Sequence, residues 1–449
     1  MRVLVYTRRR VKAFYHRLAE ETFKVSQIIY FSDDKYCEEN YIMAGFSKKV
    51  SKEIEKHYLT DEDYINIKIR CRFLRSKSEE ASRRMINTMW QTLDELIDRT
   101  QADIGFGLVI DSYVLDIYQR VLKSKGKNYY SVVPTAINNC SRITNRGEMI
   151  RIRETTDQEV DATLKMITQK SYKPWYVKDG AAHIKKNLLP YYVKDNLKLL
   201  VFSVFRIIEN NRYGFYYGSH FLKEPMMICN KISNCSPYIY FYYSWESRIK
   251  NSADKKLVYF PLQFYPECST DYWNEEIYFT NYYRILFDQV KQLRGSELLL
   301  LIKEHPIALG YRDTDVYKTL LQHENVLLVP HDVSSTQLIE LSDCVITGGT
   351  STAIESYVKG KLVLTNGRIV YDDGTIFENI TEEIMEKKAL KEFVLNKIEK
   401  HESNDPKKLI KYLLECAIPF NFNPLVDPVE KGKEIKEMGM SISKLLENM

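Results

Sequence analysis

The feature that most constrains this chain is a regular alternation of short apolar runs with amphipathic helical segments. In the second half, β-strands are predicted over Leu257–Phe260, Leu298–Lys303, Asn325–Val329, Cys344–Thr347 and Leu362–Thr365. Between them, apolar residues at helical spacing predict helices over Glu276–Leu293, Val316–Gln322, Ser335–Leu341 and Thr352–Lys359. Strands that alternate with helices over short connections form a parallel sheet with right-handed crossovers. The second half therefore predicts an α/β domain.

The N-terminal part of the sequence follows the same alternation. Strands are predicted over Val3–Thr7, Gln27–Phe31, Asn66–Phe73, Ile104–Ile110 and Tyr129–Val133. Helices are predicted over Lys12–Lys24, Ser78–Arg99 and Tyr113–Lys125. This pattern predicts a second parallel sheet, built in the same way as the first.

The length of the chain indicates two domains, since 449 residues exceed the roughly 250 to 300 at which a single core stops growing. We expect Rossmann-like domains at residues 1–156 and 252–380. Between them, residues 157–251 predict a helical, aromatic-rich insertion or linker, with helices over Val160–Lys170 and Ala181–Ile208 and an aromatic patch from Tyr213 to Tyr243. Residues 381–449 predict a helical tail.

Composition excludes several classes of protein. The net charge of +5, from 65 basic and 60 acidic residues, comes without a dense basic run, so no nucleic-acid partner is expected. The 8 cysteines form no CxxC pair, which argues against a zinc site or a disulfide framework and favours a reducing compartment.

The sequence predicts neither a targeting segment nor a membrane span. The apolar stretch Leu197–Ile208 is interrupted by Lys198 and Arg206, and it is shorter than the roughly 20 residues that a span requires. We therefore expect a soluble cytoplasmic protein. The basic first helix and the tyrosines of Tyr238–Tyr243 leave peripheral contact with the inner face of a membrane open, although buried aromatics and a solvated helix face are the favoured interpretation.

Two strand-to-helix junctions carry the candidate ligand-binding residues. After the apolar strand Leu298–Lys303 come Glu304, His305 and Pro306, and the proline holds His305 in extended backbone. An imidazole fixed there can hydrogen-bond the base, ribose or phosphate of a nucleotide. Lys303 and Glu304 pair either with each other or with a ligand, and the sequence leaves both alternatives open.

The second junction follows the strand Cys344–Thr347. Gly348 and Gly349 allow close approach of the backbone, and a helix N-terminus with hydroxyl side chains suits a phosphate. The candidate nucleotide-binding residues are Lys303, His305, Pro306, Gly349, Thr350, Ser351, Thr352 and Glu355. We expect Glu355, one turn into the helix, to accept hydrogen bonds from ribose hydroxyls. An ordinary N-cap and a solvent-facing glutamate are the structural alternatives.

These motifs resemble the bacterial capsular polysaccharide biosynthesis family, which includes Kdo transferases. The resemblance rests on residues 261–270, the Lys-Glu-His-Pro step, residues 346–356 and the pair Gly360 and Lys361. More distantly, the chain is similar to bacterial sialyltransferases. It departs from the family at Tyr265 and Gln263, where the family carries a glutamine and a histidine.

The resemblance implies a metal-independent GT-B glycosyltransferase without a cofactor. A GT-B enzyme holds an acceptor-side domain, here residues 1–156, and a nucleotide-sugar-binding domain, here residues 252–380. The implied reaction moves a sugar from an activated donor, with CMP-Kdo favoured, to an oligosaccharide or lipid-linked glycan of a capsule or surface polysaccharide. The implied site contains no metal, and the step Asp372-Asp373-Gly374 predicts a β-turn.

Glycosyl transfer needs a carboxylate that acts as base or nucleophile, and two candidates follow predicted strands. Glu267 comes after Pro266, and Asp111 lies in a helix-capping position after Ile104–Ile110. Arg142 and Arg146 look like an arginine pair that the family often carries, and they could neutralise a sugar carboxylate or a phosphate. A simple cap and a solvated basic turn are the structural alternatives.

Two other functions remain open. A teichoic-acid-like phosphotransferase, which uses CDP-glycerol, also carries a His-Pro step, although an Asp-Tyr-Ser-Ser turn usually stands where this chain has Gly348–Ser351. The other is a non-catalytic nucleotide-binding component of capsule assembly.

Overall fold

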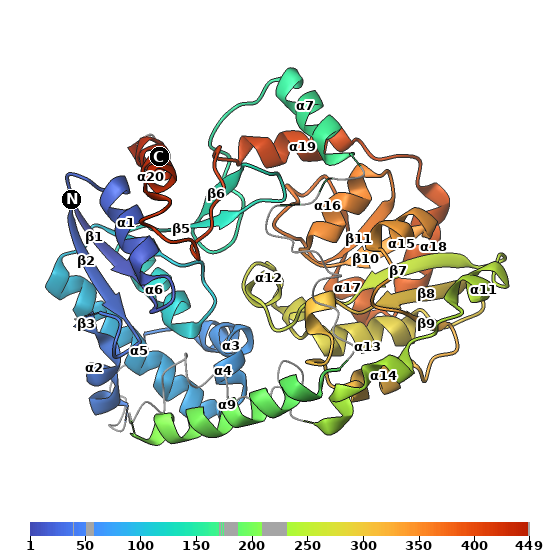
Figure 1. The fold of residues 1–449 in the computed structure, drawn as a ribbon, viewed down its shortest axis with the longest axis horizontal. Helices are drawn as coiled ribbons and strands as arrows, with labels where there is room; N and C mark the ends of the chain where they lie inside the picture. The colour runs from blue at the N-terminus through green and yellow to red at the C-terminus, as the bar shows by residue number, and fades with distance from the viewer. Residues whose placement is uncertain are drawn as a thin grey trace. The chain divides into compact units, whose positions relative to one another are not determined.

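The computed structural model describes residues 1–38, 40–50, 58–169, 172, 174, 187–208 and 231–447. The chain forms two compact units (Figure 1). The first comprises Met1–Glu154, Phe202–Leu222 and Glu415–Met449, and the second comprises Thr155–Val201 and Lys223–Leu414. The domain boundaries expected from the sequence stay predictions.

The first unit is built on a six-stranded sheet in the order β3-β2-β1-β4-β5-β6. Its strands are β1 (Arg2–Tyr6), β2 (Gln27–Ser32), β3 (Asn40–Tyr41), β4 (Ile104–Gly107), β5 (Tyr129–Pro134) and β6 (Ser141–Thr144). All neighbours are parallel except β5 and β6, which form an antiparallel pair. The predicted strand Ile104–Ile110 therefore ends three residues early, at Gly107.

Helices of the first unit come from both ends of the chain. They are α1 (Lys12–Thr22), α2 (Ile42–Lys49), α3 (Asp61–Arg70), α4 (Arg72–Arg75), α5 (Glu79–Thr100), α6 (Tyr113–Ser124) and α20 (Gly432–Glu447). In Figure 1 the red α20 lies beside the blue α1. Ile435, Met438 and Ile442 of α20 share one core with Phe14 and Leu18 of α1. The C-terminus of the chain thus completes the N-terminal unit.

The prediction of a strand at Asn66–Phe73 is wrong, because this segment lies in helices α3 and α4. Thr60 and Asp63 form a capping box that starts α3, and the first turn is acidic. Tyr64, Ile67 and Arg70 are buried at a spacing of three residues, which is the period of a helix and not of a strand.

The second unit holds another six-stranded sheet, in the order β12-β11-β10-β7-β8-β9, and all its strands are parallel. The strands are β7 (Lys256–Pro261), β8 (Leu298–Lys303), β9 (Val326–Val329), β10 (Cys344–Thr347), β11 (Leu362–Asn366) and β12 (Glu378–Ile380). The predicted α/β fold class, with two sheets whose strands are mostly parallel, is confirmed.

The second unit also carries the helices of the middle segment and most of the tail. The α-helices are α7 (Asp157–Ile167), α9 (Leu189–Ile208, shared with the first unit), α11 (Trp245–Lys250), α12 (Cys268–Asp271), α13 (Tyr282–Gln292), α14 (Thr314–Leu320), α15 (Ser335–Leu341), α16 (Ser351–Val358), α17 (Glu382–Glu386), α18 (Leu390–Lys400) and α19 (Pro406–Glu415). The 3-10 helices are η2 (Ile232–Cys235), η3 (Pro237–Tyr240), η4 (Ile277–Thr280) and η5 (Pro306–Ala308).

Three predictions for this unit need correction or completion. The helix expected from Glu276 begins only at Tyr282, because the Asn281 side chain caps the first turn of α13 and Ile277–Thr280 forms a 3-10 helix. Parts of the predicted helix Ala181–Ile208 and of the aromatic patch lie outside the described residues. The described end of that patch is partly core: Phe241 is buried and Tyr238 and Tyr240 pack against the same cluster, whereas Tyr242 and Tyr243 are exposed.

Strand β8 shows how this sheet is buried on both faces. Leu298, Leu300 and Ile302 point into one apolar cluster, and Leu299 and Leu301 point into another. Lys303, the last residue of β8, lies on the same face as Leu299 and Leu301, and Glu304, which follows it, lies on the other face. No helix among the described residues is long and apolar enough to cross a membrane.

Each sheet reverses its strand order once, between β1 and β4 in the first and between β7 and β10 in the second. Such a switch point opens a crevice at the carboxyl ends of the strands, which is where α/β proteins bind ligands. The residues that follow these four strands are therefore the candidates for ligand binding.

Candidate functional site

The carboxyl edge of the second sheet is organised by a buried ion pair, Glu304 with Arg312. Arg312 donates from Nε and Nη2 to the two carboxylate oxygens at 2.5 and 2.9 Å, and both side chains are at most 1 % exposed. Tyr317 Oη and the backbone N–H of His305 also donate to Glu304. A buried ion pair is stable only when its remaining hydrogen bonds are satisfied, and this carboxylate accepts four.

The same guanidinium ties β8 to its neighbour β7. Arg312 Nη2 donates to the backbone carbonyl of Gln263, which follows β7, at 2.7 Å. Arg312 Nη1 donates to Tyr283 Oη on α13. Glu304 is therefore paired with Arg312 and not with Lys303, and contact of Lys303 or Glu304 with a ligand stays a prediction.

His305 is held as a neutral hydrogen-bond donor. Its Nδ1 accepts from the backbone N–H of Ile307 at 3.3 Å, and its ring lies against Phe264 with centroids 5.6 Å apart. Burial, with the nearby Arg312 and Lys303 charges, lowers the pKa of His305 to about 4. A neutral ring whose Nδ1 accepts carries its proton on Nε2, so Nε2–H can donate to an anionic or hydroxyl ligand.

Lys303 places a buried positive charge on the opposite face from Glu304. Its side chain is 5 % exposed, and Nζ donates to Ser335 Oγ at 3.3 Å. Among the described residues, no carboxylate lies within 4.0 Å of this ammonium. Burial lowers the pKa of Lys303 to about 8. An ammonium that is buried without a carboxylate is costly in the free protein and suited to bind an anion.

At the switch point, the side chain of Gln263 lies against Gly348. A Cβ placed on Gly348 would meet Gln263 Nε2 at 2.1 Å, so any other residue there requires this amide to shift. Thr270 Oγ1 donates to Gln263 Oε1 at 2.9 Å, and Tyr282 Oη accepts from its backbone N–H at 2.9 Å. The glutamine that departs from the family pattern is thus fixed at the end of β7, between the ends of β8 and β10.

The turn after β10 leads directly into α16. Thr350 is the N-cap residue, but its side chain makes no capping hydrogen bond and instead lies 3.1 Å from Thr347 Oγ1. Gly349, Thr350, Ser351 and Thr352 are each partly exposed at this edge. The predicted alternative of an ordinary side-chain N-cap at this turn is wrong, and an accessible helix N-terminus remains.

Glu355 is not a freely solvated side chain, because its Oε1 accepts from Thr336 Oγ1 of α15 at 2.6 Å. Glu267, by contrast, is exposed, stands at the N-cap of α12 and accepts from Ser269 Oγ at 2.8 Å. The ribose-binding role of Glu355 and the catalytic role of Glu267 stay predictions.

Asp111 lies at the switch point of the first sheet, where Arg8 of the β1 end holds it. Arg8 donates to both carboxylate oxygens, at 2.5 and 2.8 Å, and to Ser112 Oγ at 3.1 Å. The N-cap of α6 is Ser112, so the prediction that Asp111 caps this helix is wrong by one residue. Its catalytic role stays a prediction.

The Arg8 side chain extends this network to a third strand. Arg8 Nε donates to Tyr6 Oη at 2.9 Å, and Tyr6 Oη donates to Asp33 Oδ1 at 2.7 Å. Burial raises the pKa of Asp33, which is 1 % exposed at the end of β2. Polar side chains thus join the ends of β4, β1 and β2 within the first unit.

The side chains of Arg142 and Arg146 make hydrogen bonds within the first unit, in and next to strand β6. Arg142 is 1 % exposed and donates to the backbone carbonyls of Gly147 and Glu148. Arg146 donates to both carboxylate oxygens of Asp116 on α6, at 2.8 and 3.1 Å. Their predicted role toward a substrate anion stays a prediction, and the solvated basic turn considered for them is wrong.

Asp372 and Asp373 lie between β11 and β12, and the backbone turn there closes at Ile369–Asp372, just before the step predicted to form a β-turn. Asp372 Oδ1 accepts from the backbone N–H groups of Gly374 and Ile376. In the part of the chain that the structure describes, no group of three or more His, Cys, Asp or Glu side chains is arranged to hold a metal ion.

The sequence did not predict several residues that hold the candidate site residues in place but lie outside the Lys-Glu-His-Pro step and the Gly348–Thr352 turn. Arg312, Tyr283 and Tyr317 complete the Glu304 cluster, Ser335 and Thr336 contact Lys303 and Glu355, and Arg8 holds Asp111. Only Gln263 gave a signal, as a departure from the family pattern beside a strand end. The others follow from tertiary packing, which periodicity does not report.

Residues 243–397 match the model of a family described as capsule polysaccharide biosynthesis protein. This segment contains β7 to β12 and all the residues at the carboxyl edge of the second sheet. The resemblance predicted from the sequence is thereby confirmed over these residues. No curated protein matches the chain.

Solved structures similar to the chain include three transferase or transferase-like proteins. The beta Kdo 2,7 transferase of Thermosulfurimonas dismutans KpsC is 11 % identical, with a TM-score of 0.36, and 99 % of each chain is covered. The beta Kdo 2,4 transferase of that KpsC is 10 % identical, with a TM-score of 0.34, over 93 % of this chain and 90 % of that one. MurG of Acinetobacter baumannii is 10 % identical, with a TM-score of 0.30, over 99 % of each chain. Similarity at this level carries no argument about activity, so the site rests on its own residues.

The Glu304–Arg312 pair yields the first prediction. Arg312→Met leaves Glu304 buried and uncompensated, and we expect the free energy of unfolding to fall by about 3–5 kcal/mol. Arg368, whose side chain is 44 % exposed beside Glu275, offers the matched control. Arg368→Met should change stability by less than about 0.5 kcal/mol. Urea unfolding measures both, and equal effects of the two substitutions would contradict the organising role of the pair.

Replacement of Lys303 is expected to raise the free energy of unfolding, whereas replacement of Arg312 lowers it. Because burial lowers its pKa to about 8 from 10.5, Lys303 binds a proton less tightly in the folded than in the unfolded chain. Its charge therefore destabilises the free protein fully below pH 8, and this cost shrinks as the pH rises toward 10.5. We expect Lys303→Met to stabilise the free protein by about 1–3 kcal/mol at pH 7.

The control for Lys303 is Lys256→Met, since the Lys256 side chain is 54 % exposed on β7. It should leave stability nearly unchanged at every pH. Thermal unfolding between pH 6 and 10 follows both variants. A loss of stability in Lys303→Met would show that the lysine is a structural residue and would remove the case for an anion site.

Proposed function

We propose that the chain is a glycosyltransferase that moves a sugar from a nucleotide-activated donor to a growing bacterial capsule or surface polysaccharide. The family match over residues 243–397 supports the class of pathway. One observation carries the proposal. The buried Lys303, which has no described carboxylate within 4.0 Å, and the partly exposed helix N-terminus at Thr350–Thr352 both lie at the carboxyl edge of the second sheet.

The donor site that these residues form is suited to a sugar nucleotide. Neighbouring strands lie about 4.8 Å apart, so the ends of β8 and β10, with β7 between them, are about 10 Å apart. That distance suits a phosphate at the N-terminus of α16 with further contacts to His305. Nε2–H of the neutral His305 donates a hydrogen bond to the nucleotide, and Lys303 supplies the charge.

The remaining roles follow the family resemblance. Glu355, held by Thr336, accepts hydrogen bonds from the ribose, and a CMP-sugar such as CMP-Kdo is the favoured donor. Glu267 and Asp111 are the proposed catalytic carboxylates, and Arg142 and Arg146 are the proposed contacts to a substrate anion. An oligosaccharide or a lipid-linked glycan is the acceptor.

The test of the donor site is a thermal-shift titration with CMP, CDP, UDP and GDP. A ligand that binds only the folded chain raises its melting temperature, and we expect CMP to give the largest shift. His305→Ala and Ser351→Ala should each weaken CMP binding by about 3- to 10-fold, since each removes one hydrogen bond. His323→Ala, placed before β9 at the opposite edge of the same sheet, is the matched control and should bind CMP as the natural chain does.

The outcomes separate the proposed activity from its rivals. No shift with any of the four nucleotides, or unchanged CMP affinity in both site variants, would refute the donor site. CMP binding without consumption of CMP-Kdo in the presence of a glycan acceptor would identify a non-catalytic component. A larger shift with CDP, together with turnover of CDP-glycerol, would identify a phosphotransferase.

A further inference from the structure

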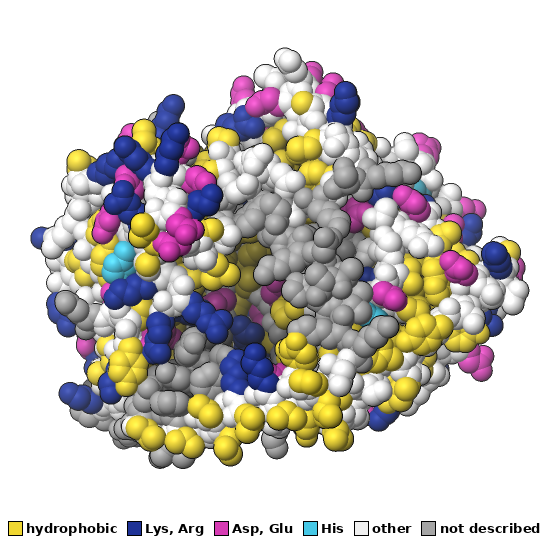
Figure 2. All heavy atoms as spheres, viewed as in Figure 1, with side chains coloured by type: hydrophobic (Ala, Val, Ile, Leu, Met, Phe, Trp, Pro, Cys, Tyr) yellow, Lys and Arg dark blue, Asp and Glu magenta, His cyan; other side chains and the backbone are white. Residues whose placement is uncertain are grey.

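Helix α9 carries an apolar surface that the proposed reaction does not use. Seven of its large apolar side chains are between 47 % and 72 % exposed. They are Leu189, Val193, Leu197, Leu200, Val201, Val204 and Ile208, and we call them the α9 stripe. In Figure 2 apolar side chains form a row along the position that α9 has in Figure 1. A run of this length differs from the single exposed apolar residues that any protein surface carries.

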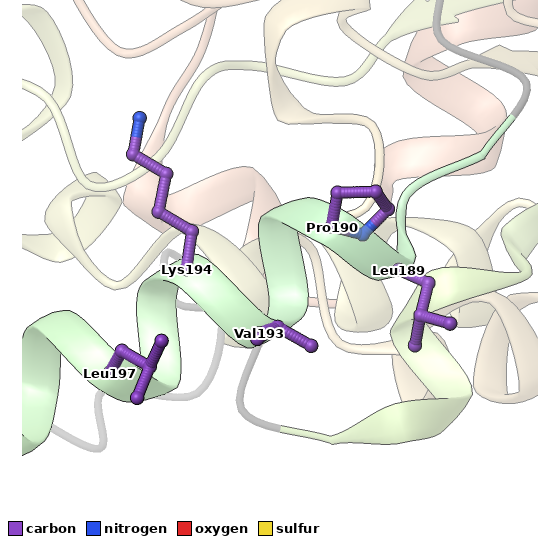
Figure 3. Close-up of a pocket in the computed structure, with 5 residues that line it drawn as sticks. All are labelled: Leu189, Pro190, Val193, Lys194 and Leu197. Atoms are coloured by element: carbon purple, nitrogen blue, oxygen red, sulfur yellow. The ribbon is translucent and has the colours of Figure 1, made fainter.

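The stripe is continuous along one side of the helix. At 3.6 residues per turn, its seven positions fall within an arc of about 120°, and the lysines at positions 194 and 198 border that arc on one side. Figure 3 shows Leu189 and Val193 directed away from Lys194 at the shallow hollow that these residues line with Pro190 and Leu197. Both lysines are exposed.

The width and the charge of this surface indicate its partner. An arc of about 120° is wider than the narrow seam of a two-helix coiled coil. The exposed side chains described on α9 include Lys194 and Lys198, and the described carboxylate of this helix, Asp195, is half-buried beside both lysines. A second copy of the helix would therefore offer these lysines no exposed carboxylate. An anionic lipid surface supplies both an apolar phase for the stripe and negative headgroups for lysines at its border.

We propose that α9 docks the protein in the plane of an anionic lipid bilayer, with the α9 stripe in the acyl boundary and Lys194 and Lys198 at the headgroups. Membrane docking goes beyond the proposed function and does not depend on it. It differs from the membrane contact considered for Tyr238–Tyr243, where Phe241 is buried while Tyr242 and Tyr243 are exposed.

The test is sedimentation of the full chain with vesicles of phosphatidylcholine alone or of phosphatidylcholine mixed with anionic phosphatidylglycerol. We expect binding to the anionic vesicles that falls as salt rises. The triple variant Leu197→Ser, Leu200→Ser, Val204→Ser should bind at least about tenfold more weakly. Lys194→Glu with Lys198→Glu should abolish the preference for anionic vesicles.

The matched control replaces two exposed apolar residues elsewhere, Leu425→Ser and Val429→Ser, which are 74 % and 87 % exposed in the natural chain. This variant should bind vesicles normally. Unchanged binding by the triple variant, or no vesicle binding by the natural chain, would overturn the proposal. So would a change from dimer to monomer in the triple variant without vesicle binding, because it would identify a second copy as the occupant. CMP affinity in the triple variant should match the natural chain, which keeps this test distinct from that of the donor site.

Discussion

The buried pair of Glu304 and Arg312 is the interaction on which the second unit's candidate site depends. One carboxylate accepts from Arg312, from Tyr317 and from the backbone of His305, and one guanidinium reaches β7 through the carbonyl of Gln263. The ends of two neighbouring strands are thereby tied together by buried side chains. The Lys303 ammonium, on the opposite face, has no described carboxylate within 4.0 Å, and burial lowers its pKa although the charges of Glu304 and Asp332 raise it.

At each switch point, side chains join the two central strands of the sheet, but the two sheets use different side chains. In the first sheet a charged pair, Arg8 with Asp111, joins the ends of β1 and β4. In the second sheet a neutral amide, Gln263, lies against Gly348 between β7 and β10. A neutral amide adds no negative charge beside Lys303 and the α16 N-terminus, and this suits a phosphate. The carboxylate of the first unit suits a hydroxyl or a cation instead.

Periodicity predicted both sheets because strands buried on two faces read as continuous apolar runs, as in Leu298–Ile302. It failed at Asn66–Phe73, where the capping box of Thr60 and Asp63 outweighed a pattern of apolar residues that also fits a strand. The motifs located His305 and the Gly348–Thr352 turn, since these follow strand ends directly. Arg312, Arg8 and Ser335 could not be found this way, because their contacts join segments that only the folded chain brings together.

The central claim is that the carboxyl edge of the second sheet binds the phosphate of a nucleotide. A crystal structure of the chain with bound CMP tests it most directly. The account predicts that the phosphate oxygens lie within about 3.2 Å of backbone N–H groups in Thr350–Thr352, with Lys303 Nζ or His305 Nε2 in hydrogen-bond contact with the nucleotide. A nucleotide bound elsewhere, or a phosphate that contacts none of these groups, would contradict it.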